Sequence, residues 1–143
     1  MMSYEAYMNQ VIQPMRDELT RNGFQELRTA EEVEQTLPNA KGLTLVVVNS
    51  VCGCAAGLAR PAVVHSLKHS TKPDNIYTVF AGQDKEATAK AREYFEGYPP
   101  SSPSFAIMKD GKIMTMVERH QIENNDLQTI ANLLTNAYDQ YSK

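Results

Sequence analysis

The fold is most clearly encoded in the stretch Leu43-Thr44-Leu45-Val46-Val47-Val48-Asn49-Ser50-Val51-Cys52-Gly53-Cys54. Its first part, residues 43–49, is mainly apolar without alternation, which is typical of a β-strand that is covered on both faces in a parallel sheet. We therefore expect this strand in the centre of an α/β sheet. The chain's only two cysteines follow directly after it.

Working outward from this strand, apolar residues that recur every three or four positions predict helices. The predicted helices cover residues 4–22, 29–38, 55–69 with a bend at Pro61, 84–96 and 124–141. A capping box at residues 29–32 marks the start of the second helix. Further strands are predicted over residues 76–81, 104–108 and 113–117, and the hairpin signal Asp110-Gly111 joins the last two.

The order of these elements indicates the fold class. After two N-terminal helices it reads β-α-β-α-β-β-α, and the first two crossovers are long enough to be right-handed. The sequence therefore predicts an α/β sandwich. We expect residues 1–143 to form one domain, with residues 1–40 as an N-terminal helical extension packed on it.

Charge and hydropathy disfavour several classes of partner. The chain has 14 basic and 17 acidic residues, so there is no overall positive charge to attract nucleic acid or an anionic membrane. No apolar run approaches the roughly 20 residues of a membrane span, and the N-terminus does not resemble a secretory signal. We expect a cytoplasmic protein, in which a pair of cysteines is more often catalytic, redox-sensing or metal-binding than structural.

The spacing of the two thiols restricts their geometry. Residues i and i+2 of a helix point about 200° apart, so Cys52 and Cys54 cannot share a helical face. We expect Cys52 just before the first turn, with Gly53 giving the backbone freedom to bring the sulfurs together. The N–H groups at a helix start favour a thiolate, which makes Cys52 the better nucleophile. A disulfide across one residue closes a small, strained ring that exchanges readily.

The two cysteines are compatible with two other interpretations. They are compatible with two small buried side chains at a strand end, which is a common place for free cysteine. They are also compatible with a soft-metal site for zinc or copper(I), but two thiolates supply only half of a tetrahedral site. The three histidines, His65, His69 and His120, show no ligand spacing tied to the cysteines. We therefore expect no bound metal.

A second feature is the segment Ser101-Ser102-Pro103-Ser104. Proline at the entry to a strand is a natural place for a cis peptide bond, and this strand should start beside the end of the central strand. The backbone of Ser102 is then in a position to pair with an extended substrate or a small thiol. A plain turn made by residues 99–103 is the alternative interpretation.

Taken together, these residues resemble the bacilliredoxin family of the thioredoxin-like superfamily. The likeness rests on residues 46–62, residues 78–89, Pro99–Ser104 and Arg119-His120, and it extends over essentially the whole chain. The resemblance implies a thioredoxin-like sandwich and an enzyme that removes bacillithiol from proteins on which it forms a mixed disulfide. It also implies that Cys52 attacks and takes the bacillithiol, that Cys54 is the candidate resolving thiol, and that Pro103 is the cis-proline.

The resemblance further implies the partners. They are S-bacillithiolated proteins, bacillithiol as a thiol co-substrate, and a bacillithiol disulfide reductase that recycles it; no tightly bound cofactor is expected. Some relatives carry another cysteine at the C-terminus, which this chain lacks. Bacillithiol carries two carboxylates on its malate, so basic groups are expected near the thiols. The candidate substrate-binding residues are Gly53, Ser102, Pro103, Arg60, Arg119 and His120.

Two further functions use the same residues. A general protein disulfide oxidoreductase or isomerase would apply Cys52 and Cys54 to protein disulfides, and a soft-metal carrier would use them as ligands. Competition with a bacillithiol mixed disulfide distinguishes the first from bacillithiol removal, and stoichiometric retention of metal distinguishes the second.

Overall fold

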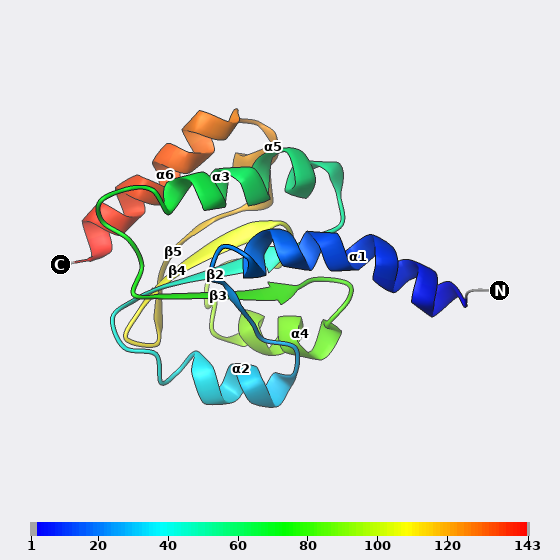
Figure 1. The fold of residues 1–143 in the computed structure, drawn as a ribbon. Coiled ribbons are helices and arrows are strands. Elements are labelled where there is room, and N and C mark those ends of the chain that lie inside the picture. Colours follow the sequence, from blue (N-terminus) through cyan, green and yellow to red (C-terminus); the bar gives the residue numbers. More distant parts are fainter. Residues whose placement is uncertain (1–2, 143) are drawn as a thin grey trace.

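The computed structural model describes residues 3–142, which form a five-stranded sheet between two layers of helices (Figure 1). The strand order is β1-β3-β2-β4-β5. Strand β2 pairs with β3 in parallel and with β4 antiparallel, and β5 is antiparallel to β4. The strands are β1 (Gln25–Glu26), β2 (Leu43–Asn49), β3 (Asn75–Phe80), β4 (Ser104–Lys109) and β5 (Lys112–Val117). The central position predicted for residues 43–49 is confirmed.

The continuous apolar run of β2 is explained by burial on both faces. Leu45 and Val47 point into one core cluster, and Val46 and Val48 point into the other. Every residue of β2 is buried. Because neither face of this strand meets water, alternation of polar and apolar residues is not needed.

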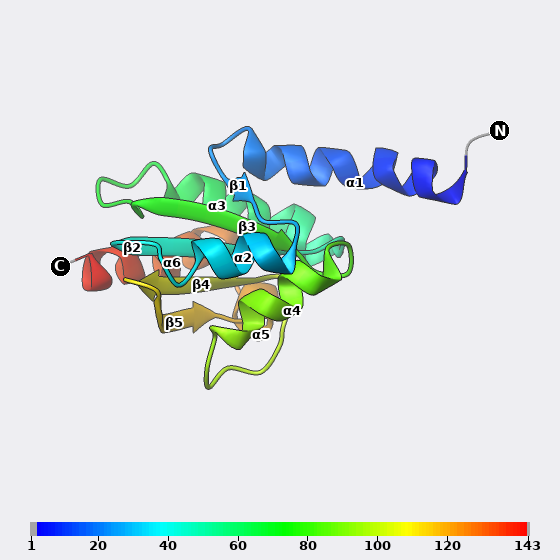
Figure 2. The same cartoon turned by 90° about the horizontal axis from the view of Figure 1, so that it is seen from below.

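The helices divide between the two faces of the sheet, as Figure 2 shows. The helix α1 (Tyr4–Thr20), the π-helical turn η1 (Ala55–Ala59), α3 (Arg60–Ser66) and α6 (Leu127–Tyr141) supply residues to the first core cluster. The second cluster is covered by α2 (Ala30–Thr36) and α4 (Lys85–Glu93). A short helix, α5 (Arg119–Glu123), precedes α6.

Local signals in the sequence account for several element ends. Thr29 caps α2 as expected, because its Oγ1 accepts from the Glu32 N–H at 3.1 Å. The capping box is incomplete, since the Glu32 carboxylate accepts from the Arg28 N–H at 3.0 Å and not from that of Thr29. The hairpin predicted at Asp110-Gly111 is confirmed, and its turn has positive φ at both residues, 50° and 82°, as a type I′ turn requires.

Three elements differ from the prediction. The helix expected over residues 55–69 consists of η1 followed by α3, and the Arg60 N–H bonds to the Ala55 carbonyl, five residues back. Because Pro61 has no N–H, a regular α-helical ladder across it was not available. Residues 119–123, expected in a loop, form α5, and residues 25–26 form the edge strand β1. Two-residue and five-residue elements are too short to show a periodic pattern.

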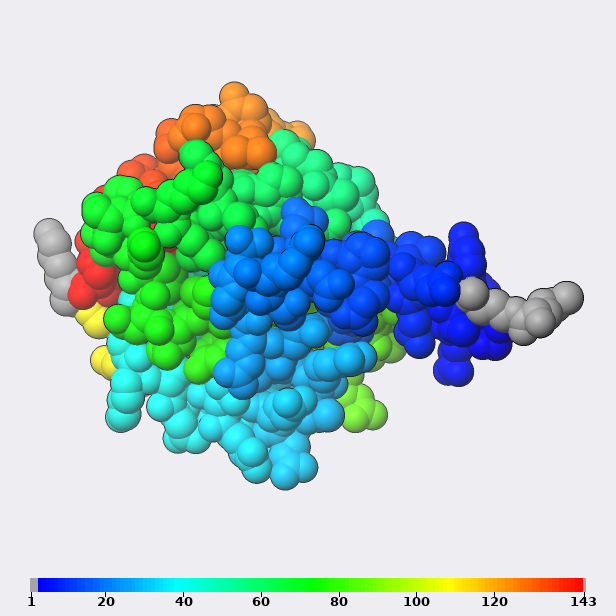
Figure 3. All heavy atoms as spheres, in the orientation of Figure 1, coloured from blue at the N-terminus to red at the C-terminus, as the bar shows by residue number. Residues whose placement is uncertain are grey.

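The N-terminal helix α1 extends beyond the body of the protein (Figure 3). The side chains of Ile12 and Leu19 on its inner half are buried, whereas those on its outer half are exposed: Tyr4, Tyr7 and Val11. Among residues 3–142, no helix has the length and apolar character that crossing a membrane requires.

Candidate active site

The two thiols lie where β2 leaves the sheet and a helical turn begins. The carbonyl of Cys52 accepts hydrogen bonds from the N–H groups of Ala55 at 3.1 Å and Ala56 at 3.2 Å, so Cys52 precedes the turn. Gly53 and Cys54 are already helical and lead into η1. This agrees with the expectation that Cys52 lies just before the first turn. Both cysteines are free and half-buried.

The environment distinguishes the two sulfurs. Cys52 Sγ and Cys54 Sγ are 2.8 Å apart, within hydrogen-bonding distance. Partial burial alone opposes ionisation of Cys52, but hydrogen bonds from the Cys54 thiol, the Ser50 hydroxyl and the Ala55 N–H, together with the Arg119 charge, lower its pKa below the ordinary value. Burial and the neighbouring Cys52 raise the pKa of Cys54. Cys52 is therefore the more readily ionised of the two thiols, and the Cys54 thiol lies within hydrogen-bonding distance of its sulfur.

We expect Cys54→Ala to raise the pKa of Cys52, because the variant removes the thiol that donates to the Cys52 sulfur. Cys54→Ser keeps a hydroxyl donor at the same place and should raise the pKa less. The measurement is the alkylation rate of Cys52 with iodoacetamide as a function of pH, followed by mass spectrometry. Identical pH profiles for the alanine variant and the unchanged protein would contradict the assigned roles.

A buried polar network holds the strand end that carries the thiols. Arg60 Nη1 donates to Asn49 Oδ1 and to the Ser50 carbonyl, both at 2.9 Å, and Arg60 Nε donates to Glu18 of α1 at 2.9 Å. The Ser50 hydroxyl oxygen accepts from the Cys52 N–H at 3.3 Å. Arg60 is only 3% exposed, so the structure turns it inward and does not present it beside the sulfurs as a substrate ligand. Arg60 thus contacts Ser50, whose hydroxyl bonds to the Cys52 N–H, and not Cys52 itself.

The loop before β4 lies at the same edge of the sheet as the thiols. Ser104, the first residue of β4, pairs with Val48 near the end of β2. The Ser102–Pro103 peptide bond is cis, as predicted. Arg119, at the start of α5, contacts this loop: its Nη1 donates to the Ser102 carbonyl at 3.1 Å and its backbone N–H to Ser101 Oγ at 3.4 Å. Its charge acts on both cysteine sulfurs.

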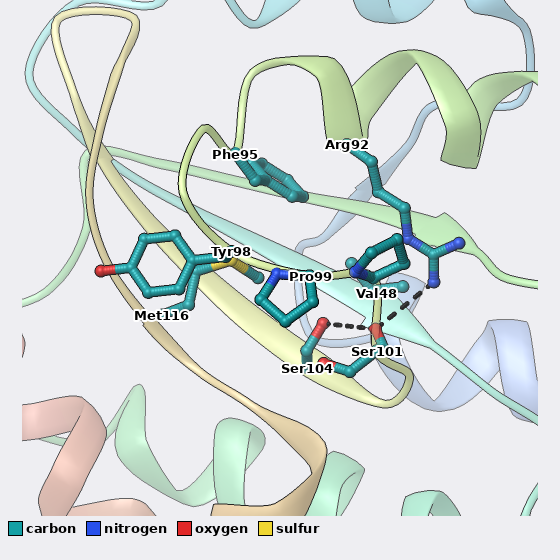
Figure 4. Close-up of a pocket in the computed structure, with 9 residues that line it drawn as sticks. Val48, Arg92, Phe95, Tyr98, Pro99, Ser101, Ser104 and Met116 are labelled. Carbon is teal, nitrogen blue, oxygen red and sulfur yellow. Dashed lines mark hydrogen bonds between the residues drawn. The ribbon is translucent and has the colours of Figure 1, made fainter.

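A small pocket adjoins the other side of the loop (Figure 4). Arg92 reaches from α4 toward it and donates to the Ser101 carbonyl at 3.4 Å, and Ser104 Oγ donates to the same carbonyl at 2.9 Å. Burial lowers the pKa of Arg92. No ion pair is formed by Arg92 within residues 3–142.

The remaining candidates are placed as follows. His120 is 68% exposed, and its Nε2 lies 3.5 Å from Glu118 Oε2. His69 Nε2 lies 3.0 Å from Asp139 Oδ1. The part of the chain that the structure describes contains no group of three or more side chains suited to a metal ion.

Three contributors were not predicted from the sequence: Ser50, Glu18 and Arg92. Ser50 was detectable in principle, because polar Asn49 and Ser50 follow an apolar run and immediately precede a thiol. Glu18 and Arg92 reach the site from distant helices, which a single sequence does not reveal.

Comparison with known proteins supports thiol chemistry at this site. A family model described as disulphide isomerase matches residues 7–142. The chain is 57% identical to a bacilliredoxin of Geobacillus kaustophilus over 141 residues, which is 98% of this chain and 97% of the relative. It is 54% identical to a bacilliredoxin of Staphylococcus aureus over 140 residues, covering 98% and 96% of the two chains.

Solved structures show the fold. The thioredoxin of Fasciola hepatica superposes with a TM-score of 0.59 at 22% identity, covering 82% of this chain and 99% of that one. The thioredoxin of Malassezia sympodialis gives a TM-score of 0.55 at 14% identity, covering 85% and 92%. The α/β sandwich described above is thus thioredoxin-like.

Proposed function

The chain belongs to the bacilliredoxin family and is a thiol–disulfide oxidoreductase, and we propose that it removes bacillithiol from proteins that carry this thiol in a mixed disulfide. Bacillithiol is the thiol co-substrate, and S-bacillithiolated proteins are the partners. The observation that carries the proposal is a Cys52 of lowered pKa next to a loop that holds Arg119, a partner for carboxylates.

In the first step, the thiolate of Cys52 attacks the bacillithiol sulfur of the mixed disulfide. A bond between Cys52 and bacillithiol forms while the bond to the target protein breaks, and the target cysteine leaves as a thiolate that takes a proton from water. One disulfide replaces another, so no external electrons are needed. The lowered pKa of Cys52 keeps a larger fraction of it ionised at neutral pH than an ordinary thiol.

In the second step, Cys54 loses its proton and its sulfur attacks Cys52. Bacillithiol leaves and takes up a proton, and a Cys52–Cys54 disulfide forms. Alternatively, a second bacillithiol attacks the bacillithiol sulfur of the Cys52–bacillithiol disulfide, so that Cys52 leaves as a thiolate and bacillithiol disulfide is released for reduction by a bacillithiol disulfide reductase. Both routes need a reducing compartment, and the proposal places them in the cytoplasm.

The proposal is tested by the release of free bacillithiol from an S-bacillithiolated protein, measured by mass spectrometry with a scrambled protein disulfide as competitor. We expect catalytic release that the competitor inhibits weakly. Preferred turnover of the scrambled disulfide without bacillithiol release would favour a general disulfide oxidoreductase or isomerase. Stoichiometric retention of zinc or copper(I) by the purified protein would favour a metal carrier.

A further inference from the structure

Two successive carbonyl groups in the loop before Pro103 are already engaged. The Ser101 carbonyl accepts from Ser104 Oγ at 2.9 Å and from Arg92 at 3.4 Å, and the Ser102 carbonyl accepts from Arg119 at 3.1 Å. Arg92 belongs to α4 and Arg119 to α5, so the loop is held from two different elements. A substrate that needs an acceptor at this loop must therefore compete with an arginine for it.

The donors of the same loop are available. Within residues 3–142, the Ser102 N–H makes no hydrogen bond to another protein group. Arg119 is 45% exposed, and only its Nε and Nη1 are engaged, with Glu123 at 3.3 Å and with Ser102. Since a guanidinium has five N–H donors, Arg119 retains donors that can turn to a ligand. The loop and Arg119 therefore offer hydrogen-bond donors to a ligand but few free hydrogen-bond acceptors.

This asymmetry separates two kinds of substrate. An extended peptide that pairs antiparallel with one residue exchanges two bonds with it, one to its N–H and one from its carbonyl. At Ser102 the carbonyl that would form the second bond already accepts from Arg119, so the peptide N–H has to compete with the guanidinium for this oxygen. A carboxylate only accepts hydrogen bonds, so it can use the Ser102 N–H and the guanidinium without displacing the existing contact.

We infer that Arg119 is a specificity-determining residue: it directs the enzyme to the small, carboxylate-bearing half of a mixed disulfide and disfavours an extended peptide at Ser102. The identity of the small thiol as bacillithiol rests on the proposed function; the exclusion of peptide does not. The consequence for the partners is that a target protein is recognised by its modification and not by the sequence around its cysteine. Targets of unrelated sequence are then equivalent substrates.

The test compares kcat/KM for two disulfides. One is a bacillithiol mixed disulfide of a blocked cysteine, and the other is the symmetrical disulfide of an extended, uncharged peptide with blocked ends. Arg119→Ala should lower kcat/KM about tenfold for the first. It should raise kcat/KM about fivefold for the second, the factor that one recovered hydrogen bond contributes. The ratio between substrates cancels any general change in Cys52 reactivity.

Two further variants separate charge from hydrogen bonding. Arg119→Gln keeps an amide donor for the Ser102 carbonyl without the charge, so it should lose activity on the bacillithiol disulfide without the gain on the peptide. Arg21→Ala is the matched control, because Arg21 is an exposed arginine whose Nε also donates to a backbone carbonyl, that of Asp17 at 3.1 Å. Arg21→Ala should leave kcat/KM unchanged for both the bacillithiol disulfide and the peptide disulfide.

The outcomes separate this inference from the proposed function. An unchanged substrate ratio in Arg119→Ala overturns the inference even if the unaltered enzyme releases bacillithiol. If the unaltered enzyme releases none but Arg119→Ala still gains activity on the peptide, the proposed function fails and the role of Arg119 in excluding peptide stands.

Discussion

Replacing Cys52 with serine is expected to lower the rate of bacillithiol release by about a thousandfold or more. A serine hydroxyl is not ionised at neutral pH, and the chain has no third cysteine that can take over the attack. Cys54 does not substitute well, because burial raises its pKa and this cause remains when Cys52 is replaced. The measurement is the initial rate of bacillithiol release at saturating mixed disulfide.

Cys54→Ser is the matched control for this prediction. It leaves the attacking thiolate in place, so one equivalent of target protein should be released quickly while the Cys52–bacillithiol adduct accumulates. Intact mass spectrometry detects the adduct, and added bacillithiol should discharge it. Near-normal release by the Cys52 variant together with complete loss in the Cys54 variant would reverse the assigned roles.

Arg60→Met is expected to lower the free energy of unfolding by about 3 kcal/mol. The variant keeps the apolar length of the side chain but removes the donors to Asn49 Oδ1 and to the Ser50 carbonyl, which lie in the protein interior. The buried Ser50 carbonyl loses its arginine donor, which costs about 1–3 kcal/mol. Asn49 Oδ1 still accepts from the Ser50 N–H, and the partly exposed pair with Glu18 contributes at most about 1 kcal/mol. Urea unfolding followed by circular dichroism measures the change.

The variant Glu18→Gln tests whether charge or hydrogen bonding dominates this network. Glu18 is 33% exposed, so we expect a loss of at most about 1 kcal/mol. Folded Arg60→Met protein should also show a shifted pH profile for Cys52 alkylation, since Ser50 is no longer held. Unchanged stability and an unchanged profile together would show that Arg60 does not support the active-site strand.

The sequence predicted most of the architecture because the relevant signals are local and long. The unbroken apolar run of β2 requires two covering layers, and the Asp110-Gly111 pair specifies a tight hairpin, so both were predicted correctly. The helix after the thiols was predicted, but its π-helical first part was not. An interruption at Pro61 follows from its missing N–H, but residue type alone does not specify that the Arg60 N–H bonds to the carbonyl of Ala55, five residues back.

The sequence predicted the candidate site less completely. Cys52, Cys54 and the cis bond before Pro103 follow from residue type and neighbours. Whether each arginine is buried or exposed does not follow from residue type, because a sequence does not distinguish a buried guanidinium from an exposed one. Arg60 and Arg119 were equal candidates for contact with carboxylates, and only the fold turns the first toward Asn49 and leaves the second at the surface.

The pairing of strand β2 also determines which parts of the protein unfold locally. From Thr44 to Val48, each residue is paired with both β3 and β4, so its amide is released to solvent only when the sheet separates. Backbone amides here should exchange with deuterium among the slowest in the chain, whereas those of the outer half of α1 should exchange quickly. Cys52 and Cys54 follow Val48, the last of these doubly paired residues, by four and six positions. Local opening of the N-terminal helix end therefore leaves the reacting atoms in place.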